Sequence, residues 1–159
     1  MRLATGAVAL GLSVGFARSA LAVEVNFTGT ASNYWYYLGN WQGSHEPAAG
    51  DVADVFYSSQ QVNYNVSGSS VVDLKAVQIS GPTNSSTATL SFLGSGTFLQ
   101  TMGLYIGAGE TGLNGTQSSA GPGKVTQSVG EVEMDPNSVL AVDPLSSYTF
   151  SGGTLIGNN

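Results

Sequence analysis

Cysteine is absent from this sequence, and basic residues are almost absent. Without thiols the chain can form no disulfide, thiolate metal site or iron–sulfur cluster, and it has no cysteine nucleophile. Its 4 lysines and arginines face 10 aspartates and glutamates, which gives a net charge of -6. Because phosphate groups are bound by clustered cations, this balance excludes nucleic acid and disfavours an anionic membrane surface as a partner.

Helix-forming patterns are scarce as well. Charged residues make up only 9% of the chain, whereas glycine occurs 22 times. Beyond the first 22 residues, no stretch keeps apolar residues at helical spacing without an intervening Gly or Pro. Short alternating runs bounded by turn residues recur instead, and they predict strands at 62–66, 77–79, 89–93 and 132–134. The sequence therefore predicts an all-β domain.

The first 22 residues have the features of a signal peptide. Arg2 precedes an apolar run that ends at Ala17, and Ala20-Leu21-Ala22 is a small-residue cleavage site. The run is shorter than the roughly 20 apolar residues that a membrane span needs, and Arg18 interrupts it. We expect cleavage after Ala22, export from the cell, and no membrane span in the mature chain, which begins at Val23.

One short motif occurs twice near the end of the chain. Residues 125–132 read VTQSVGEV and residues 148–155 read YTFSGGTL; both contain Ser, any residue, Gly, any residue and an aliphatic residue. A third copy is aligned at Gly96, and the longer interval that follows it fits an inserted loop at 110–123. The glycines assigned to this repeat are Gly96, Gly130, Gly152 and Gly153.

A repeat of just over twenty residues with a fixed Gly-x-aliphatic step is typical of a solenoid. In a β-solenoid each coil contributes short strands, and inward aliphatic residues stack on those of the neighbouring coils. We therefore expect a right-handed parallel β-solenoid (β-helix), with equivalent inward positions at Phe98, Val132 and Leu155. A β-sandwich with Gly-rich turns is the alternative.

The stretch NWQGSHEPAAGDVADVF at 40–56 resembles the opening module of bacterial surface proteins that carry autotransporter-associated β-solenoid repeats. This family includes exported proteins with a C-terminal PEP-CTERM sorting tag. The repeats of the family are similar to residues 104–107, 125–130 and 148–155 of this chain. The module's matching residues are Asn40, Trp41, Pro47, Gly50, Asp51, Ala53 and Phe56. The resemblance implies an aromatic N-terminal cap followed by coils.

The chain departs from the family pattern at two places. Val129 stands where the first Gly of a Gly-Gly pair is expected, so that corner must be made differently. No sorting tag or translocator barrel follows, and the last residues fall inside a coil, which predicts a chain truncated at its C-terminus. The expected division is a signal peptide at 1–22, an aromatic cap region at 23–66 and β-solenoid coils at 67–159.

Three acidic residues alternate in the stretch EVEMD. On a strand Glu131, Glu133 and Asp135 share one face, and Val132 and Met134 share the other. Carboxylates in this arrangement suit a Ca²⁺ site or the acid pair of a glycoside hydrolase. The simpler interpretation is a solvated strand face opposite core residues, and no metal or other cofactor is expected.

The aromatic region offers a second candidate. Exposed rings among Tyr34 to Tyr37 and Trp41 could stack on sugars, whereas buried tryptophans would plug the end of the solenoid. Asp51 and Asp54 could bind a cation, although Asp51 better suits a turn held by hydrogen bonds to backbone N–H groups. We expect a structural cap made of Trp35, Trp41, Pro47, Gly50 and Asp51.

These features predict a non-enzymatic protein. His45 is the only histidine, and no G-x-S-x-G motif accompanies it, so a Ser–His–Asp triad is not expected. We expect an adhesin-like or scaffold protein of the bacterial cell surface or extracellular space, of Gram-negative type. Its expected partners are glycans of the cell surface or extracellular matrix, and further coils or a C-terminal anchor. The alternative is a carbohydrate-active protein, either a glycan-binding module or a pectate-lyase-like enzyme.

Overall fold

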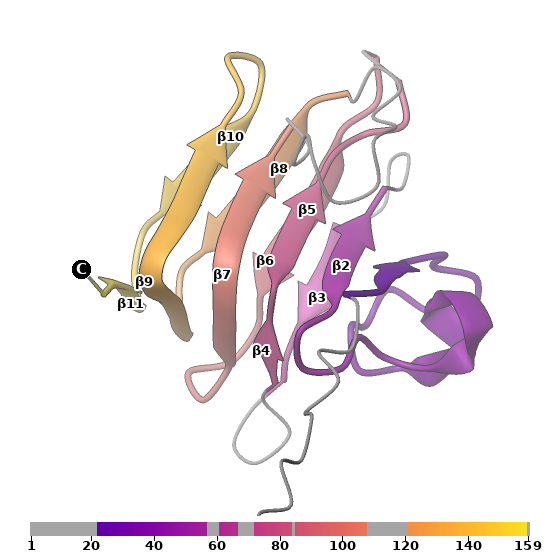
Figure 1. Ribbon diagram of the computed structural model, residues 1–159. Coiled ribbons are helices and arrows are strands. Elements are labelled where there is room, and N and C mark those ends of the chain that lie inside the picture. The colour runs from indigo at the N-terminus through magenta and orange to yellow at the C-terminus, as the bar shows by residue number, and fades with distance from the viewer. Residues whose placement is uncertain (1–21, 57–60, 67–71, 84, 108–120, 159) are drawn as a thin grey trace, which may run out of the picture.

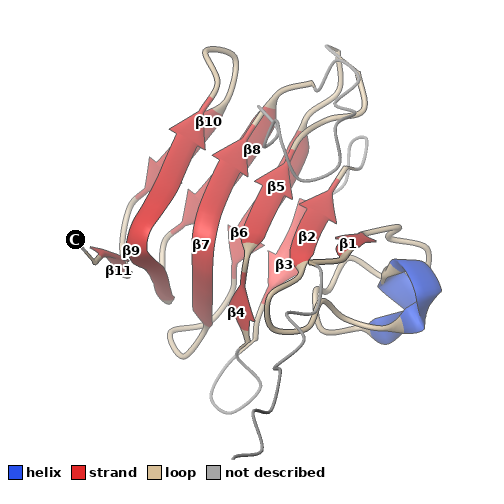
Figure 2. Ribbon diagram, viewed as in Figure 1, coloured by secondary structure: helices blue, strands red, loops and turns tan. Residues whose placement is uncertain are grey.

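The computed structural model shows an all-β chain in which parallel strands form two sheets (Figures 1 and 2). It describes residues 22–56, 61–66, 72–83, 85–107 and 121–158. The predicted signal peptide, apart from Ala22, and most of the predicted inserted loop lie outside these residues. In the part of the chain that is described, no helix is long and apolar enough to cross a membrane.

The larger sheet contains seven strands and the smaller sheet four. The order in the larger sheet is β1 (Glu24–Asn26), β2 (Val52–Val55), β5 (Ala76–Ile79), β7 (Phe98–Ile106), β9 (Glu131–Val142) and β11 (Thr154–Gly157), with β4 (Asp73–Leu74) paired beside β7. The order in the smaller sheet is β10 (Ser147–Phe150), β8 (Gly123–Gln127), β6 (Ala88–Phe92) and β3 (Gln61–Tyr64).

The chain changes sheet at almost every step. From β2 onward it passes to the smaller sheet at β3, returns at β4 and β5, and continues this alternation as far as β11. Every pairing between these strands is parallel, which requires a crossover between successive strands of one sheet. Figure 1 shows the smaller sheet behind the larger one. Each return through the smaller sheet therefore serves as the crossover for the larger one.

The core lies between the sheets and is built from aligned columns of apolar side chains. Residues with the same register position on successive strands share one column, because the strands are parallel and side chains alternate between faces. Three columns of the larger sheet are Val25, Ala53, Val77, Leu104 and Leu140; Val55, Ile79, Ile106 and Val142; and Leu99, Val132 and Leu155. All members are buried except those on the last strand segments, which are Leu140, Val142 and Leu155.

The register confirms one part of the predicted repeat and corrects another. Leu155 pairs with Val132, as the alignment of the two motifs predicts. Phe98 pairs with Glu131, so Leu99 and not Phe98 is the counterpart of Val132. The alignment at Gly96 is thus wrong by one residue, and a slip of one residue exchanges the two faces of a strand.

The turns explain why some of the repeat glycines are required. Gly130 and Gly153 have φ values of 77° and 87°, where an L side chain is strained, and a Cβ on Gly153 would lie 2.4 Å from the Gly130 carbonyl oxygen. Gly96 has neither constraint; in its turn the left-handed residue is Gly94, with φ of 96°. Val129 is accommodated because Gly130 alone supplies the left-handed conformation.

A compact segment at one end of the sheets lies mostly outside the ladder of strands. It spans about residues 28–50 and contains two short 3₁₀ helices, η1 (Leu38–Asn40) and η2 (Gln42–Ser44). We call this segment the cap. The expected cap region at 23–66 also includes β1, β2 and β3, which belong to the sheets. Figure 1 shows the cap beside β1 and β2, far from the C-terminal strand β11.

Candidate functional site

Buried aromatic rings join the cap to the core. Trp41 and Trp35 are only 2% and 3% exposed, and their ring centroids lie 4.7 Å apart at 74°. The Trp41 indole N–H donates to the Trp35 carbonyl oxygen at 2.6 Å, which satisfies the polar end of a buried ring. Edge-to-face or tilted contacts continue in both directions through Phe27, Trp41, Trp35, Tyr64 and Phe92. Both tryptophans thus lie where a plug would lie, and neither is available to stack on a sugar.

Asn40 holds the cap in one conformation. Its side chain is fully buried, and Oδ1 accepts hydrogen bonds from the backbone N–H groups of Ala31 and Ser32 at 3.1 and 2.7 Å. The Nδ2 group donates to the Tyr34 carbonyl oxygen at 2.7 Å and to the Ser32 hydroxyl at 2.8 Å. The Asn40 amide therefore supplies hydrogen-bond partners for backbone groups of a segment that belongs to neither sheet. The Asn-Trp motif was the only sequence signal for this role.

The same segment presents three exposed tyrosines. Tyr34, Tyr36 and Tyr37 are 40%, 52% and 49% exposed, and the rings of Tyr34 and Tyr36 lie 5.8 Å apart with a tilt of 49°. The backbone between them is held by Asn40 and by a hydrogen bond from Tyr37 N–H to the Tyr34 carbonyl oxygen at 3.3 Å. Of the aromatic cluster that the sequence singles out, the tyrosines and not the tryptophans are therefore placed to contact a ligand.

Asp51 fixes the turn that leads from the cap into β2. Its carboxylate accepts hydrogen bonds from Ala48 N–H at 2.9 Å and from Val23 N–H at 3.2 Å. Gly50 precedes it with φ of 82°, and Pro47 is buried beneath the turn. Asp51 thus binds one backbone N–H group of this turn and one just before β1, in agreement with the hydrogen-bonding interpretation.

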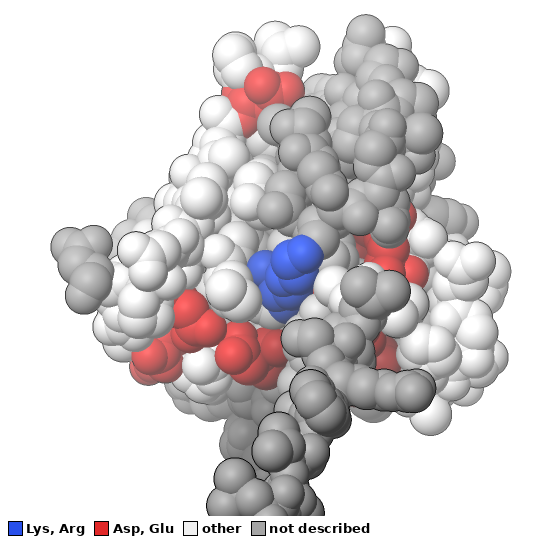
Figure 3. Space-filling model, in the orientation of Figure 1, with Lys and Arg blue, Asp and Glu red and all other residues white. Residues whose placement is uncertain are grey.

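The acidic stretch of β9 has the predicted two-faced character. Val132 and Met134 are buried, whereas Glu131, Glu133 and Asp135 are partly exposed on the outer face of the larger sheet. Figure 3 shows acidic side chains gathered along the lower part of this face, below a basic side chain. The carboxylates are therefore accessible to solvent on one side.

The structure adds partners to these carboxylates that the sequence does not predict. Glu133 accepts a hydrogen bond from Asn158 Nδ2 at 2.8 Å, and Asp135 accepts one from Gln100 Nε2 at 3.2 Å. Burial, the charge of Asp135 and a hydrogen bond to that carboxyl group raise the pKa of Asp73. Asp73 lies on β4, which pairs with β7, so the fold brings it to Asp135 across the sheet.

A second carboxyl pair is more deeply buried. Asp54 lies on β2, is only 8% exposed, and has one carboxyl oxygen that is buried without a hydrogen-bond partner. Burial, the charge of Glu24 and a hydrogen bond between the two carboxyl groups raise the pKa of Asp54 to about 7. Such a hydrogen bond requires one proton, because two carboxylates offer only acceptors. The pKa of Asp54 is therefore well above that of an ordinary aspartate.

In the part of the chain that is described, these groups do not form a metal centre. No group of three or more His, Asp or Glu side chains there could hold a metal ion, so Glu131, Glu133 and Asp135 are not arranged as a Ca²⁺ site. His45 is exposed in the cap, and its Nδ1 lies 3.3 Å from the Glu46 carbonyl oxygen, a backbone contact only. Among the candidates that the sequence offers, the three exposed tyrosines of the cap are the side chains best placed to contact a ligand.

Comparisons of the sequence with protein-family models, with curated proteins and with solved structures found no match.

Proposed function

We propose that this chain is an exported, non-enzymatic β-solenoid that serves as a scaffold or adhesin-like protein at the bacterial cell surface. The observation that carries the proposal is the alternation of the chain between two parallel sheets with aligned core columns. Such a ladder adds length by repetition and supplies a stiff surface without needing a reactive centre. This supports the solenoid over the β-sandwich, whose strands are mainly antiparallel.

The location in this proposal comes from the sequence. The N-terminal segment has the basic, apolar and small-residue parts of a signal peptide, and the order of motifs resembles exported solenoid proteins of the autotransporter-associated and PEP-CTERM groups. A stable core without cysteine also suits a surface protein whose rigidity comes from its ladder. Further coils or an anchor, supplied by additional chain or by a partner, would attach this unit to the cell.

Export is tested by expressing the full chain in a Gram-negative host and measuring the mass of the protein outside the cytoplasm. We expect a mature chain that begins at Val23. The matched control is Ala22→Arg, which removes the small residue at the cleavage position and should leave the precursor uncleaved. Exported wild-type protein that retains Met1 would contradict the proposal.

One observation favours a second candidate function, glycan binding. The exposed rings of Tyr34, Tyr36 and Tyr37 lie on a segment made rigid by Asn40, and aromatic faces stack on the apolar faces of sugar rings. A glycan array compares the wild type with Tyr36→Ala and with Phe150→Ala, an exposed aromatic outside the cap. Glycan retention that is lost only in Tyr36→Ala supports the candidate, and absence of retention by the wild type rejects it.

The enzymatic form of the carbohydrate-active alternative has weaker support. The two carboxyl groups of Asp54 and Glu24 are hydrogen bonded to each other, and so are those of Asp73 and Asp135. In each pair one carboxyl group is therefore the hydrogen-bond partner of the other, and the pair is not directed at a substrate. Incubation of the purified chain with polygalacturonate, followed by detection of unsaturated uronates, tests the lyase directly. We expect no product above that of a heat-denatured sample.

A further inference from the structure

Two Asp-Pro peptide bonds occur in the described part of the chain, at Asp135–Pro136 and at Asp143–Pro144. In such a bond the aspartate side chain can reach its own peptide carbonyl carbon and close a cyclic anhydride. The leaving group is the nitrogen of a tertiary amide, which departs as the secondary amine of proline. Both bonds have this chemistry in common, so their folded surroundings decide which of them reacts.

The first bond lies in the bulge that divides β9. The register against β7 gives residues 135–138 no partner, since pairing stops after Met134 and resumes at Val139. Asn137 in this bulge has φ of 66°, in the left-handed region, and Pro136 is exposed. The Asp135–Pro136 bond is therefore held outside the pairing between β9 and β7.

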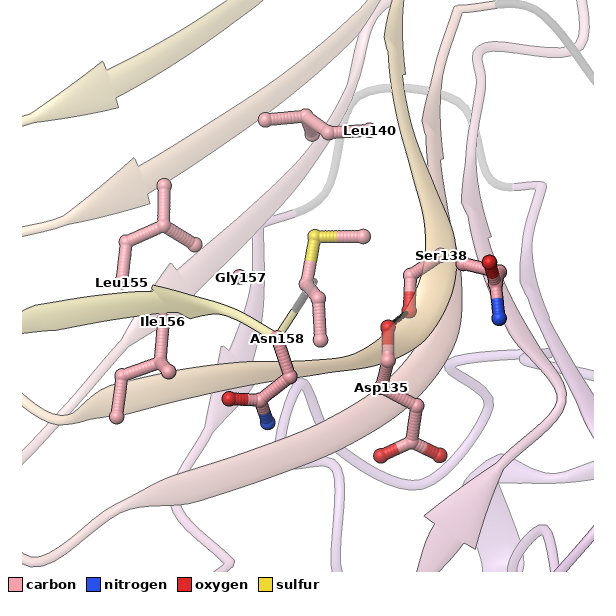
Figure 4. A pocket seen from close by; sticks show the side chains of 9 residues that line it. Asp135, Ser138, Leu140, Leu155, Ile156, Gly157 and Asn158 are labelled. Atoms are coloured by element: carbon pink, nitrogen blue, oxygen red, sulfur yellow. Dashed lines mark hydrogen bonds between the residues drawn. The ribbon is translucent and has the colours of Figure 1, made fainter.

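A hydroxyl group polarises the carbonyl of this bond. Ser138 Oγ donates a hydrogen bond to the Asp135 carbonyl oxygen, and Figure 4 shows this contact as a dashed line between the two residues. When a nucleophile adds to a carbonyl carbon, negative charge develops on the oxygen, and a donor that is already in place stabilises that charge. The Ser138 hydroxyl is thus positioned to favour attack on this bond.

Two side chains from neighbouring strands hold the Asp135 carboxyl group. Gln100 on β7 donates from Nε2 to Oδ1 at 3.2 Å, and the Asp73 carboxyl group on β4 is hydrogen bonded to that of Asp135. The bond between two carboxyl groups requires one proton. Burial, followed by the charge and hydrogen bond of Asp135, raises the pKa of Asp73, which favours that proton. The pair therefore holds a nucleophilic oxygen and a proton side by side.

The other charged groups of this region are mainly acidic. Glu133 lies on the same face of β9 and pairs in register with Gln100, whereas Lys75 follows β4. The strand β11 contains no titratable side chain, and β7 contributes the neutral amide of Gln100. Figure 3 shows the acidic side chains of this face gathered together. Such surroundings favour one shared proton over two ionised carboxylates.

We propose that the folded chain cleaves itself at the Asp135–Pro136 bond. The carboxylate oxygen of Asp135 attacks its own peptide carbonyl carbon, and the carbon–nitrogen bond to Pro136 breaks. The proton held by Asp73 moves to the prolyl nitrogen, which leaves as a secondary amine. Asp135 is then a cyclic anhydride, and one water molecule hydrolyses it to a free aspartate at the new C-terminus. The inference rests on the described bulge and does not depend on the proposed function.

The sheets hold both products together after the cut. The part of β9 before the bulge and the part after it each pair with β7, while β10 pairs with β8 and β11 with β9. Cleavage therefore creates two new chain ends on the molecule without removing a strand. The products separate only under denaturing conditions, so a native measurement of size does not reveal the reaction.

Mass spectrometry of the purified folded chain, denatured after incubation at a series of pH values from 4 to 8, tests the proposal. We expect fragments that end at Asp135 and begin at Pro136, formed roughly tenfold or more faster than fragments from the second Asp-Pro bond. That bond is an internal control. The Asp143 carbonyl oxygen also accepts a hydrogen bond, from Ser146 N–H at 2.8 Å, but Asp143 is exposed in a turn. In urea the two bonds should be cleaved at equal rates.

Two variants separate the contributions to the reaction. Asp73→Asn keeps the size of the side chain but removes the proton donor, so cleavage should slow roughly tenfold or more and lose its decline with rising pH. Ser138→Ala should slow cleavage to a similar extent at every pH. Hydroxylamine added to the wild type should capture the anhydride as a hydroxamate at Asp135, a product that a contaminating protease does not form. Circular dichroism checks that each variant keeps its strand content.

Three outcomes would overturn the proposal. The first is a folded wild type that stays intact over several days at every pH. The second is cleavage of both Asp-Pro bonds at equal rates in the folded chain, which would mean that the bulge does not select the bond. The third is undiminished cleavage in Asp73→Asn and Ser138→Ala while both remain folded, which would mean that neither side chain assists the reaction.

Discussion

The two ends of the sheets have the same repeating ladder but differ in how the ladder terminates. At the first end, Val25 begins a core column and is buried in the same apolar cluster as Phe27 and the cap residues Trp35 and Trp41. At the last end, Leu140 finishes the same column and is 41% exposed. A ladder of parallel strands does not terminate itself, so burial at each end must be supplied by residues outside the ladder.

This comparison predicts that one substitution has unequal effects at two positions of one column. Val132 and Leu155 are paired partners, but Val132 is fully buried, whereas Leu155 on β11 is 39% exposed. Val132→Asp leaves an unpaired charge in the core and should lower the free energy of unfolding by roughly 4 kcal/mol or more. Leu155→Asp should lower it by about 1 kcal/mol or less, since its carboxylate reaches water.

Thermal and urea unfolding of both variants measure this difference. The measurement belongs at a protein concentration low enough that association does not contribute to stability. Equal losses of stability would show that Leu155 is as well covered as Val132, and the contrast between the two ends of the sheets would then be wrong.

The capped end gives the second prediction. Trp41→Ala removes a buried ring that contacts Phe27 and Trp35, and should cost about 3–5 kcal/mol of stability. Tyr36→Ala, in the same segment but exposed, should change stability by less than about 0.5 kcal/mol. Urea unfolding separates these outcomes. If Trp41→Ala unfolds at the wild-type midpoint, the tryptophans do not close this end of the core.

The third prediction concerns pH and the first two strands. The folded-state pKa of Asp54 is about 7, above the 3.8 of an unperturbed aspartate, so between these values the folded chain binds more protons than the unfolded chain. The contribution of Asp54 to stability should therefore be fully present at pH 4 and below, and it should fall by roughly 2–4 kcal/mol as the pH rises to 7 and above. The same direction follows from the raised pKa values of Asp73 and Glu46.

Asp54→Asn tests this assignment, because an amide keeps the size of the side chain and cannot ionise. We expect the fall in stability between pH 5 and pH 8 to shrink in this variant. The control Asp143→Asn, at an exposed position just after β9, should leave the pH dependence of stability unchanged. Equally steep profiles in Asp54→Asn and the wild type would mean that another group controls the pH dependence.

Local patterns predicted the strands well where one face is buried. The alternation at 132–134 and the equivalence of Val132 with Leu155 follow from side-chain period and turn glycines, and both are found in the structure. The position of Phe98 was wrong because Gly96 was aligned with Gly130 and Gly153, whereas the glycine with positive φ in that turn is Gly94. Composition does not reveal an error of one residue in the alignment of a turn, but such an error exchanges the buried and exposed faces of the strand that follows.

Contacts between distant strands could not be predicted from the sequence. Strand β9 continues to Val142 through a bulge at residues 135–138, although the predicted strand ends at residue 134, because β7 offers a partner on both sides of the bulge. The contact between the carboxyl groups of Glu24 and Asp54 depends on the register of β1 against β2, two strands that the cap separates in the sequence. Asn40 was noticeable only beside Trp41, and its four hydrogen bonds depend on the folded cap.

The bond between Asp51 and the backbone nitrogen of Val23 has a consequence for biogenesis. In the precursor this nitrogen is an amide, and its hydrogen bond to the carboxylate measures 3.2 Å. If the leader is removed after Ala22, as proposed, the same atom becomes an ammonium group, and a hydrogen bond between two charged groups is roughly twice as strong as a neutral one. Proteolysis would then act as the last step of assembly, because the cut itself creates the charge that fastens β1 to the turn before β2.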